Sequence, residues 1–338
     1  MPGTDSRQAC SGLPIDHHNI MRVLVTGADG FVARHLVPVL RDAGHEVIGT
    51  AFDIAAAADL GIAVLPLDIT NPEACGAVVR DVAPEWMVHL AAVSTVRSSL
   101  ENPENTQRVN VEGTLRLLEA CGQLAFSPRV LIVGSGEEYG PNDGAPILEL
   151  PVEKLQPRSP YAESKAEVEK RIEAEPRFRA MTIRTRSFPH CGPGQRQGFF
   201  TADVASQLAA IAAQKMPPVL QVGNLEAVRD YTDVRDVVRA YHLLLERGTL
   251  GEVYNVCSGR GVKIRELLDE LINLSRMDVR VEHDPARARP SDVPVLIGSN
   301  AKLRSVTGWE PTIPLSQTLN DILAWWKFPE RAALKRGG

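Results

Sequence analysis

Met21–Ala33, MRVLVTGADGFVA, joins a run of strongly apolar residues to a glycine-rich turn. Continuous valine and leucine without polar alternation are typical of a strand that is covered on both faces of a parallel sheet. Gly27, Gly30 and Ala33 follow in the order G-x-x-G-x-x-A, in which glycine permits a tight turn and lets backbone N–H groups approach an anion. Because the helix that begins near Phe31 directs its N-terminus at that anion, the stretch predicts a pyrophosphate site.

The same stretch opens a long region in which strand and helix patterns alternate. Short runs rich in valine, isoleucine and threonine predict further strands at 45–51, 61–69, 85–92, 129–135 and 179–187. Helical patterns separate them, and the clearest of these cover 31–44, 110–124 and 159–175. This alternation predicts an α/β protein with a Rossmann-like, doubly wound parallel sheet.

The regular alternation ends near residue 190. Glycine and proline are frequent at 189–195, and one more helix and strand, at 236–248 and 252–259, return to the sheet. We therefore expect a dinucleotide-binding domain at 21–190 plus about 228–258, and a smaller C-terminal substrate-binding lobe at about 191–227 plus 259–330. Residues 1–20 lack the apolar core of a secretory signal, and we interpret them as an N-terminal extension that need not be ordered.

Composition and charge argue against several classes of protein. The 338 residues are 44% hydrophobic and 23% charged, as in ordinary globular proteins. The net charge of −5 and the lack of long Lys/Arg runs argue against a nucleic-acid partner, and no apolar run is long enough to span a membrane. Five scattered cysteines without a C-x-x-C pair argue against a disulfide framework and against a structural metal site. We expect a cytoplasmic protein without a metal.

The glycine-rich turn predicts a dinucleotide but leaves its identity open. The position that would hold the adenosine ribose falls at Thr50 or Ala51, and neither residue is acidic. Asp53 lies just beyond, and no arginine is present there to take a 2′-phosphate, so NAD and NADP both stay open. Asp68 and Ile69 suit the border of the adenine, although Asp68 suits the start of a helix equally well. The residues expected around the cofactor are Gly27, Asp29, Gly30, Phe31, Val32, Asp68, Ile69, Leu90, Ala91, Ala92, Tyr161, Lys165 and Phe188.

Tyr161 and Lys165 form the pattern Y-x-x-x-K at the start of the helix that follows Pro160. A spacing of four residues is about one helical turn, so both side chains rise from the same face. A phenol with a pKa of about 10 exchanges protons poorly at neutral pH unless a cation lies beside it. Lys165 supplies such a cation and can also bind the nicotinamide ribose. Tyr161 is therefore expected to be the general acid/base of a carbonyl–carbinol exchange.

Ser135 lies at the carboxyl end of the fifth predicted strand, where ligands bind in open α/β sheets. It is expected to donate a hydrogen bond to the substrate oxygen that Tyr161 protonates. Ser135, Tyr161 and Lys165, together with the TGxxGxxA turn, resemble the extended short-chain dehydrogenase/reductase family from Met21 to about Trp326. The resemblance implies an NAD(P)-dependent oxidoreductase with the fold described above.

Further stretches resemble one branch of that family, the enzymes that act on GDP-6-deoxy-4-keto-mannose. They are CGPGQ at 191–195, VGNLEAVRDYTDVRDV at 222–237, YNVCSG at 254–259, KIRELL at 263–268, RPSDVPVLIGS at 289–299 and TGWEP at 307–311. This resemblance implies a GDP-sugar substrate whose nucleotide and diphosphate lie in the smaller lobe. It also implies a homodimer in which the helices at 110–124 and 159–175 form a four-helix bundle across a two-fold axis.

Several residues are assigned to the substrate by matching these motifs. Arg229 and Arg289 are expected at phosphate or ribose oxygens, because a planar guanidinium suits bidentate binding. An ordinary surface ion pair is the alternative for either arginine. Lys215 is a weaker candidate for the nucleotide, and His190 is either a sugar contact or a loop contact. The residues expected to bind substrate are Ser94, Glu137, His190, Asn224, Arg229 and Arg289.

One departure from the family bears on the sugar, and two further positions bear on the reaction. Where the family has Phe-Asn-His before Gly-Pro, this chain has Phe188-Pro189-His190, and proline supplies neither an amide side chain nor a backbone donor. In VGSGEEYG, 133–140, Glu137 occupies the place of the carboxylate base of the 4,6-dehydratases, while Glu138 is expected to point away from the sugar. The donor that a dehydratase places between its serine and this glutamate is replaced here by Gly136, which has no side chain.

The GPGQ loop at 192–195 and the missing donor at Gly136 together favour the reductase over the dehydratase. The expected reaction is NAD(P)H-dependent reduction of the 4-keto group of GDP-6-deoxy-4-keto-D-mannose, which yields GDP-D-rhamnose. A GDP-mannose 4,6-dehydratase, a nucleotide-sugar 4-epimerase and a non-catalytic nucleotide-sensing Rossmann protein are the alternatives.

Overall fold

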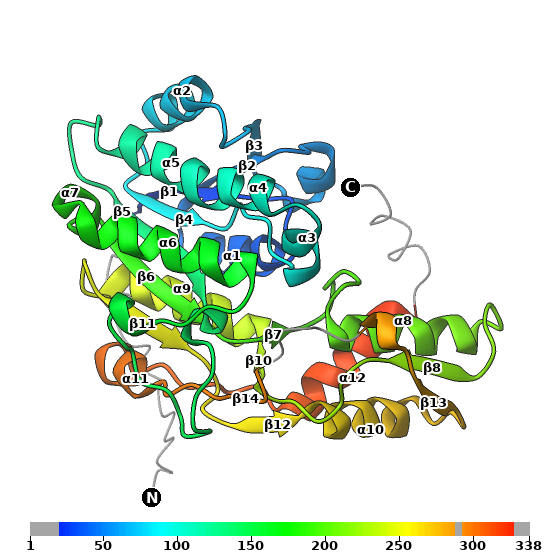
Figure 1. The fold of residues 1–338 in the computed structure, drawn as a ribbon. Helices are drawn as coiled ribbons and strands as arrows, with labels where there is room; N and C mark the ends of the chain where they lie inside the picture. The colour runs from blue at the N-terminus through cyan, green and yellow to red at the C-terminus, as the bar shows by residue number, and fades with distance from the viewer. Residues whose placement is uncertain (1–19, 288–292, 328–338) are drawn as a thin grey trace, which may run out of the picture.

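The computed structural model describes residues 20–287 and 293–327, and its centre is a seven-stranded parallel sheet (Figure 1). The spatial order of the strands is β11–β6–β5–β4–β1–β2–β3. Their bounds are β1 Arg22–Thr26, β2 Glu46–Ala51, β3 Ala63–Pro66, β4 Trp86–His89, β5 Arg129–Ser135, β6 Thr182–Ser187 and β11 Val253–Val256. The chain runs from β1 to β2 and β3 on one side and then returns to β4 on the other side of β1. A crevice forms at the carboxyl ends of the strands where this reversal occurs.

Helices cover both faces of this sheet because successive strand residues point to opposite sides. In β1, Val23 and Val25 belong to the core under α1 (Phe31–Asp42) and α9 (Val234–Arg247), whereas Leu24 belongs to the opposite core. That second core packs against α2 (Pro72–Val82), α5 (Thr114–Cys121) and α6 (Pro160–Ala174). The predicted doubly wound α/β fold is confirmed.

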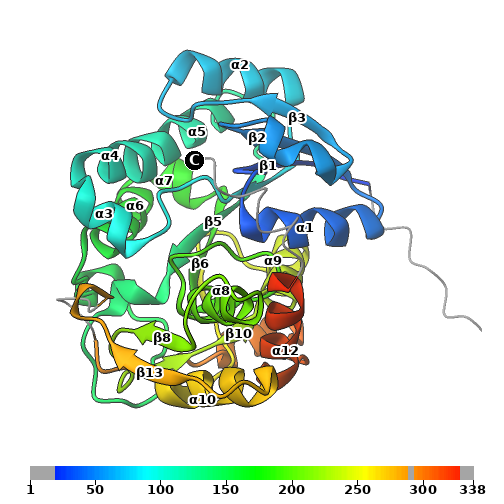
Figure 2. The same ribbon diagram turned by 90° about the vertical axis from the view of Figure 1, so that its right-hand side faces the viewer.

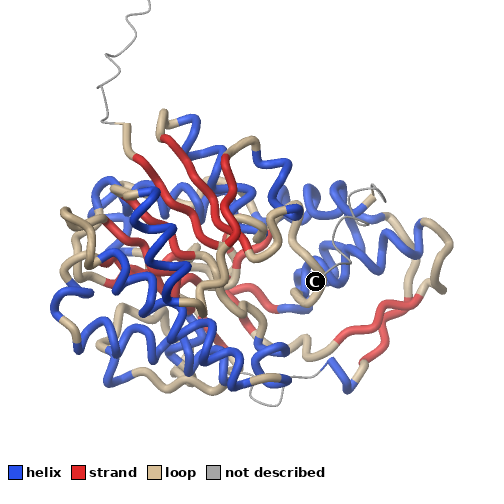
Figure 3. The backbone as a smooth tube through the Cα atoms, turned by 90° about the horizontal axis from the view of Figure 1, so that it is seen from above, coloured by secondary structure: helices blue, strands red, loops and turns tan. Residues whose placement is uncertain are grey.

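A separate core lies beyond the carboxyl ends of the strands, as Figure 3 shows from above. Its helices α8 (Phe200–Ala212), α10 (Ile264–Ser275) and α12 (Leu315–Trp326) pack on one another through residues such as Leu208, Leu271 and Ile322. The short strands β8 (Val219–Val222) and β13 (Arg280–His283) flank them in parallel. Figure 2 shows this assembly below the sheet. The predicted domain boundaries stay a prediction.

Short elements connect these layers. They are the strands β7 His190–Cys191, β9 Val228–Asp230, β10 Thr232–Asp233, β12 Gly261–Lys263 and β14 Val295–Leu296, the helices α3 Val96–Glu101, α4 Pro103–Gln107, α7 Pro176–Arg179 and α11 Ala301–Thr307, the 3₁₀ turns η1 Ala55–Leu60, η3 Gly136–Tyr139, η4 Val152–Lys154 and η5 Pro285–Arg287, and the π-helical turn η2 Arg108–Gly113.

The helix predicted at 110–124 is present over 110–121 but is not α-helical throughout. Its first part is the π-helical η2, and α5 begins only at Thr114. Asn110 explains this local change, because its buried side chain turns to the backbone of Val93, accepting from its N–H at 2.8 Å and donating to its carbonyl at 3.1 Å. Gly113 packs against Ile69, where a Cβ would lie 2.7 Å from Cδ1. The wider turn thus joins α5 to the segment after β4.

Within 20–287 and 293–327, no helix combines the length and apolarity needed to cross a bilayer. Cys75, Cys121, Cys191 and Cys257 are buried thiols in the same ranges, and Cys10 lies outside them.

Candidate active site

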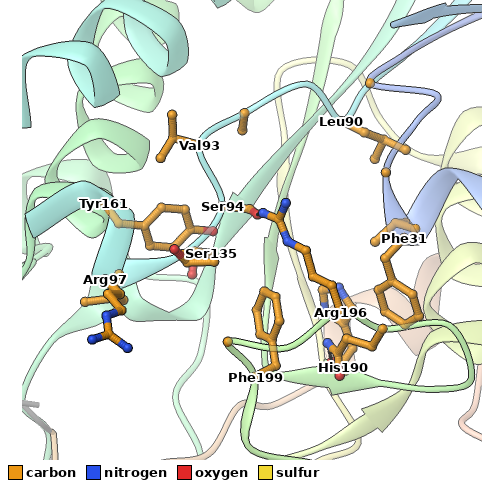
Figure 4. A pocket seen from close by; sticks show the side chains of 18 of the residues that line it. Phe31, Leu90, Val93, Ser94, Arg97, Ser135, Tyr161, His190, Arg196 and Phe199 are labelled. Atoms are coloured by element: carbon orange, nitrogen blue, oxygen red, sulfur yellow. Dashed lines mark hydrogen bonds between the residues drawn. The ribbon is translucent and has the colours of Figure 1, made fainter. Parts of the chain in front are cut away.

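A cavity of about 2010 Å³ opens where the carboxyl ends of the central strands face the separate helical core. The turn after β1, the segments after β4, β5 and β6, and the loop that leads into α8 all contribute to its wall (Figure 4). The residues predicted to bind cofactor or substrate line this one cavity, with two exceptions. Lys215 does not line it, and Arg289 lies outside the described residues. The sequence therefore identified side chains that the fold brings together, while their individual roles stay predictions.

The glycine-rich turn forms a cradle that fits a pyrophosphate. Gly27 has φ +68°, and a Cβ there would lie 2.8 Å from the backbone nitrogen of Ala91, so only glycine is accommodated. Helix α1 begins after Gly30 without a side-chain cap and without an acidic residue in its first turn. By contrast, Asn71, Thr95 and Ser159 cap α2, α3 and α6. The uncapped N–H groups of α1 are thus left to an anionic ligand.

The segment after β4 is held from beneath by a buried polar chain. His89 contacts Thr26 Oγ1 at 2.7 Å through Nδ1 and Thr114 Oγ1 at 2.9 Å through Nε2. Thr26 Oγ1 also accepts from Ala91 N–H at 3.3 Å. Burial, together with the nearby charge of Lys165, lowers the pKa of His89 to about 3, so the imidazole stays neutral. These hydrogen bonds hold the segment 90–92 against the glycine-rich turn.

Asp68 lines the cavity but is not the cap of the following helix. Its carboxylate accepts from the Thr70 N–H at 2.9 Å and from the Thr70 hydroxyl at 2.7 Å, and these bonds lower its pKa. Asn71 caps α2 instead, accepting from the Glu73 and Ala74 N–H groups. The second of the two interpretations of Asp68, a helix N-cap, is therefore wrong.

Tyr161 and Lys165 lie on the first turns of α6, and their side chains enter the cavity beside Ser135. Burial is the largest influence on Tyr161 and raises its pKa, the charge of Glu137 raises it further, and a hydrogen bond with Ser135 opposes the shift. Figure 4 shows Tyr161 and Ser135 next to each other. The phenol is therefore protonated at neutral pH, which suits a proton donor.

Lys165 donates to the Val133 carbonyl at 2.8 Å, at the carboxyl end of β5. Burial lowers its pKa to about 8, and the charge of Glu138 partly opposes this. The ammonium thus lies in a low-dielectric position and loses its proton close to physiological pH. The charge that Lys165 contributes to the site therefore changes with pH in this range.

Ser135 ends β5 and begins the 3₁₀ turn η3. Its Oγ accepts from the Glu137 N–H at 3.2 Å, and its own N–H donates to Glu138 Oε1 at 2.6 Å. The reciprocal pair is a capping box, which fixes both the backbone and the side chain of the serine. Glu137 lines the cavity, while Glu138 is directed away from it. Glu138 is fully buried rather than exposed.

A side chain at position 136 would crowd the ring of Phe188. A Cβ there would lie 3.0 Å from Cγ of Phe188, whose ring is 1% exposed and packs over the glycine. Phe188 is held in turn by its N–H, which donates to the Val256 carbonyl at 2.9 Å. A larger residue at 136 would have to displace this ring.

The substrate side of the cavity contains several predicted residues with defined partners. Ser94 Oγ accepts from Arg196 Nη2 at 3.3 Å, and Asn224 Oδ1 accepts from the Glu226 N–H at 2.9 Å. Arg229 donates to the Val228 carbonyl at 2.9 Å. Lys215, the weaker nucleotide candidate, does not line the cavity and is not brought to the site.

His190 stacks on Phe31 with the two rings 6.4 Å apart and 7° from parallel, and burial lowers its pKa. Its Nδ1 contacts the Phe188 carbonyl at 3.0 Å. Pro189 has no N–H to donate, but its carbonyl accepts a hydrogen bond from the Thr232 N–H at 3.0 Å. This bond connects the segment after β6 to β10.

Sequence reasoning missed cationic and aromatic side chains of the same cavity. Arg196 and Phe199 follow the CGPGQ motif and project into the centre of the cavity, and Arg97 enters from α3 (Figure 4). Arg34 lies at the opposite end, next to η1. Arg196 and Phe199 lie in a loop whose path no periodicity encodes, although the place of Arg196 directly after CGPGQ was an available signal. Arg97 and Arg34 lie on helices, and their approach to the cavity depends on tertiary packing. No group of three or more metal-binding side chains occurs in the described part of the chain.

Comparison with known proteins gives the family. The model of the GDP-mannose 4,6-dehydratase family matches residues 24–322. The GDP-6-deoxy-D-mannose reductase of Pseudomonas aeruginosa is 36% identical over 316 residues, which cover 90% of this chain and 97% of that protein.

Solved structures agree with this match. The structure of RMD from Pseudomonas aeruginosa in complex with NADPH has a TM-score of 0.76 at 33% identity, and UDP-glucose 4-epimerase of Thermus thermophilus in complex with NAD has a TM-score of 0.80 at 28% identity. Each match covers 91% of this chain and 99% of the other. These neighbours support a nicotinamide dinucleotide as cofactor and confirm the prediction of an oxidoreductase-type enzyme.

The cradle after β1, the Ser135–Tyr161–Lys165 arrangement and these matches agree: the chain belongs to the GDP-mannose 4,6-dehydratase family within the extended short-chain dehydrogenases/reductases.

Proposed function

We propose that the enzyme uses NAD(P)H to reduce the 4-keto group of a GDP-linked 4-keto-6-deoxyhexose, converting GDP-6-deoxy-4-keto-D-mannose to GDP-D-rhamnose. The similarity to a GDP-6-deoxy-D-mannose reductase over 90% of the chain supports the substrate class. The cavity holds cofactor-type and substrate-type residues side by side, as a reaction between the two requires.

The observation that carries the choice of reaction is the contact between Gly136 and Phe188. A 4,6-dehydratase must expel the C6 hydroxyl, and an acid donor beside the base assists that departure. Here the position between Ser135 and Glu137 has no side chain, and Phe188 fills the space that one would need. Reduction of a ketone has no leaving group and needs no such donor. The same contact therefore supports the reductase over the dehydratase.

The chain's own groups perform the proton chemistry in this proposal. When bound, the reduced nicotinamide supplies a hydride for C4 of the sugar. The Tyr161 hydroxyl delivers the proton to the C4 oxygen, since its raised pKa keeps it protonated until the oxygen develops charge. The Ser135 hydroxyl, oriented by the capping box of η3, donates a second hydrogen bond to that oxygen.

Lys165 contributes positive charge beside the reacting oxygen. Its ammonium is buried and oriented by the Val133 carbonyl, so its field is weakly screened. Glu137 raises the pKa of Tyr161 and lies in the cavity, where it is available to accept a hydrogen bond from a sugar hydroxyl. Glu137 also occupies the place of the base of the 4,6-dehydratases, and this position favours the alternative reaction.

Two parallel incubations test the proposal. The enzyme is given GDP-6-deoxy-4-keto-D-mannose with NADH or NADPH, and separately GDP-mannose without added reductant, and the products are separated by chromatography. We expect consumption of the reduced cofactor and a GDP-6-deoxyhexose in the first incubation, with unchanged GDP-mannose in the second. Conversion of GDP-mannose alone to its 4-keto-6-deoxy derivative would identify a dehydratase. Interconversion of sugar nucleotides without net redox would identify an epimerase.

A further inference from the structure

The adenosine end of the cavity carries, besides Asp53, two charged side chains that the sequence did not point to. In this fold the turn after β1 binds the pyrophosphate, and the residues after β2 lie at the adenosine ribose. Asp53 follows β2 by two residues, and Arg34 and Asp59 approach from α1 and η1. All three line the cavity, and we call Arg34, Asp53 and Asp59 the adenosine rim.

Arg34 is the cation of this rim, and its terminal nitrogens are already engaged. Nη1 donates to Asp59 Oδ1 at 2.7 Å and to Oδ2 at 2.6 Å, and Nη2 donates to the Ala56 carbonyl. Nε is buried without a partner, so it does not face the cavity. A guanidinium has five N–H donors, and at most one of them is left to turn toward a ligand.

The carboxylates of the region outnumber that cation. Asp53 Oδ1 accepts from the Ala55 N–H at 3.0 Å, which orients its carboxylate at the end of β2. Asp29 of the glycine-rich turn lies close by, because its carboxylate accepts from the Asp53 N–H. With Asp59 paired to Arg34, the charges of Asp53 and Asp29 remain without an equal cation on the rim, although Arg196 acts on Asp29 from the sugar side.

We infer that this enzyme discriminates against the 2′-phosphate and uses NADH in preference to NADPH, with Asp53 accepting a hydrogen bond from the adenosine 2′-hydroxyl and the Arg34–Asp59 pair closed to a phosphate. This inference deepens the proposed function, because it names the cofactor of that reaction. A carboxylate accepts from a ribose hydroxyl but repels a dianionic phosphate in the same place. The preference therefore follows from the charge on the rim.

The inference is tested by measuring how tightly each cofactor binds to the full chain in the absence of substrate. Binding is monitored by the quenching of tryptophan fluorescence or by calorimetry. We expect NADH to bind at least about tenfold more tightly than NADPH, since like charges in direct contact oppose the phosphate. Equal or tighter binding of NADPH would overturn the inference and leave the proposed reductase standing. Failure of both cofactors to bind would overturn the inference and the proposed function together.

Isosteric variants then identify the residues responsible. Asp53→Asn keeps the acceptor for the Ala55 N–H and removes the charge, so NADPH affinity should rise and NADH affinity should fall. Asp59→Asn releases Arg34 from its ion pair, so NADPH affinity should rise by about threefold to tenfold. The affinity for NADH should stay within about twofold of that of the unsubstituted enzyme. Asp42→Asn, an exposed carboxylate of α1 outside the cavity, is the matched control and should change neither.

A double substitution shows whether Arg34 is the group that Asp59 restrains. In the Asp59→Asn background, Arg34→Ala should abolish the gain in NADPH affinity. In the wild-type background, Arg34→Ala should leave the ratio of the two affinities within about threefold, because the paired guanidinium does not reach the phosphate. A selective loss of NADPH binding in the single Arg34→Ala variant would show instead that Arg34 already binds the 2′-phosphate, and would contradict the inference.

Discussion

At the scale of single residues, the site depends on how burial acts on a few ionisable groups. Tyr161 and Lys165 were predicted from a four-residue spacing, and the structure places both beside Ser135. The spacing did not reveal that burial raises the pKa of the phenol and lowers that of the ammonium. Those shifts come from the surrounding core, which is assembled from distant parts of the chain.

Tyr161→Phe removes the proton donor and little else. We expect turnover of the keto sugar to fall by about 10²–10⁴, the usual contribution of a positioned acid. The measurement is the rate of NAD(P)H consumption, with cofactor affinity measured in parallel as the control that the fold and the cradle after β1 are intact. Unchanged turnover would remove Tyr161 from the mechanism.

The pH dependence of turnover should report Lys165. Its pKa is lowered to about 8, so the ammonium is charged below that pH and neutral above it. Because the mechanism uses the charged form, kcat should decline as pH rises through about 8. A kcat profile that stays flat from pH 7 to 9.5, with cofactor saturating throughout, would contradict the assigned role.

The lowered pKa of Lys165 also makes the stability of the fold increase with pH. The unfolded chain holds this proton up to its ordinary pKa of about 10.4, whereas the folded chain releases it near 8. The buried charge therefore lowers the free energy of unfolding by its full amount below pH 8. This free energy rises again between pH 8 and about 10.4, where the folded chain has released the proton and the unfolded chain still holds it. Lys165→Met should reduce the pH dependence of unfolding in that interval, as followed by urea titration.

At the scale of elements, the turn η3 is supported by a buried charge cluster beneath the active site. Arg186 of β6 makes a bidentate pair with Glu169 of α6, with distances of 2.9 and 2.8 Å. Glu138 lies 4.0 Å from the same guanidinium and holds the Ser135 N–H. Burial raises the pKa of Glu138, and the neighbouring charge of Glu169 raises it further. The cluster connects β5, β6 and α6 under the catalytic serine.

Glu169→Ala should be strongly destabilising, because it leaves the guanidinium of Arg186 buried without its main partner. We expect a loss of about 3–5 kcal/mol in the free energy of unfolding. Glu167→Ala, on the same helix in a partly exposed pair with Arg171, is the matched control and should cost less than about 1 kcal/mol. Equal effects of the two substitutions in urea titrations would show that the cluster does not stabilise the fold.

The elements themselves were largely predictable, because strand and helix periodicities are local. The strands of the central sheet and the helices α1, α6 and α9 were anticipated from such patterns. The π-helical turn before α5 was not, since it depends on the contact of Asn110 with Val93 and on the packing of Gly113 against Ile69. Arg196, in the loop before α8, and Arg34, on α1, were missed for the same reason, because tertiary contacts place their side chains in the cavity.

At the scale of the whole molecule, α6 and the helices before it present one outer surface (Figure 1). The homodimer implied by the family resemblance would use this surface as a four-helix bundle. Light scattering on the purified chain should give about twice the mass of 36.8 kDa at micromolar concentration. A mass that stays at that of one chain over the whole accessible concentration range would refute the dimer.

The central claim is that a hydride passes from the cofactor to C4 of the sugar and stays there. Incubation of GDP-6-deoxy-4-keto-D-mannose with reduced cofactor that carries deuterium at the transferred position tests this most directly. Mass spectrometry and NMR of the purified product should show one deuterium, bound at C4, and an equal amount of oxidised cofactor. A product without deuterium, or a change in the sugar without oxidation of the cofactor, would contradict the account.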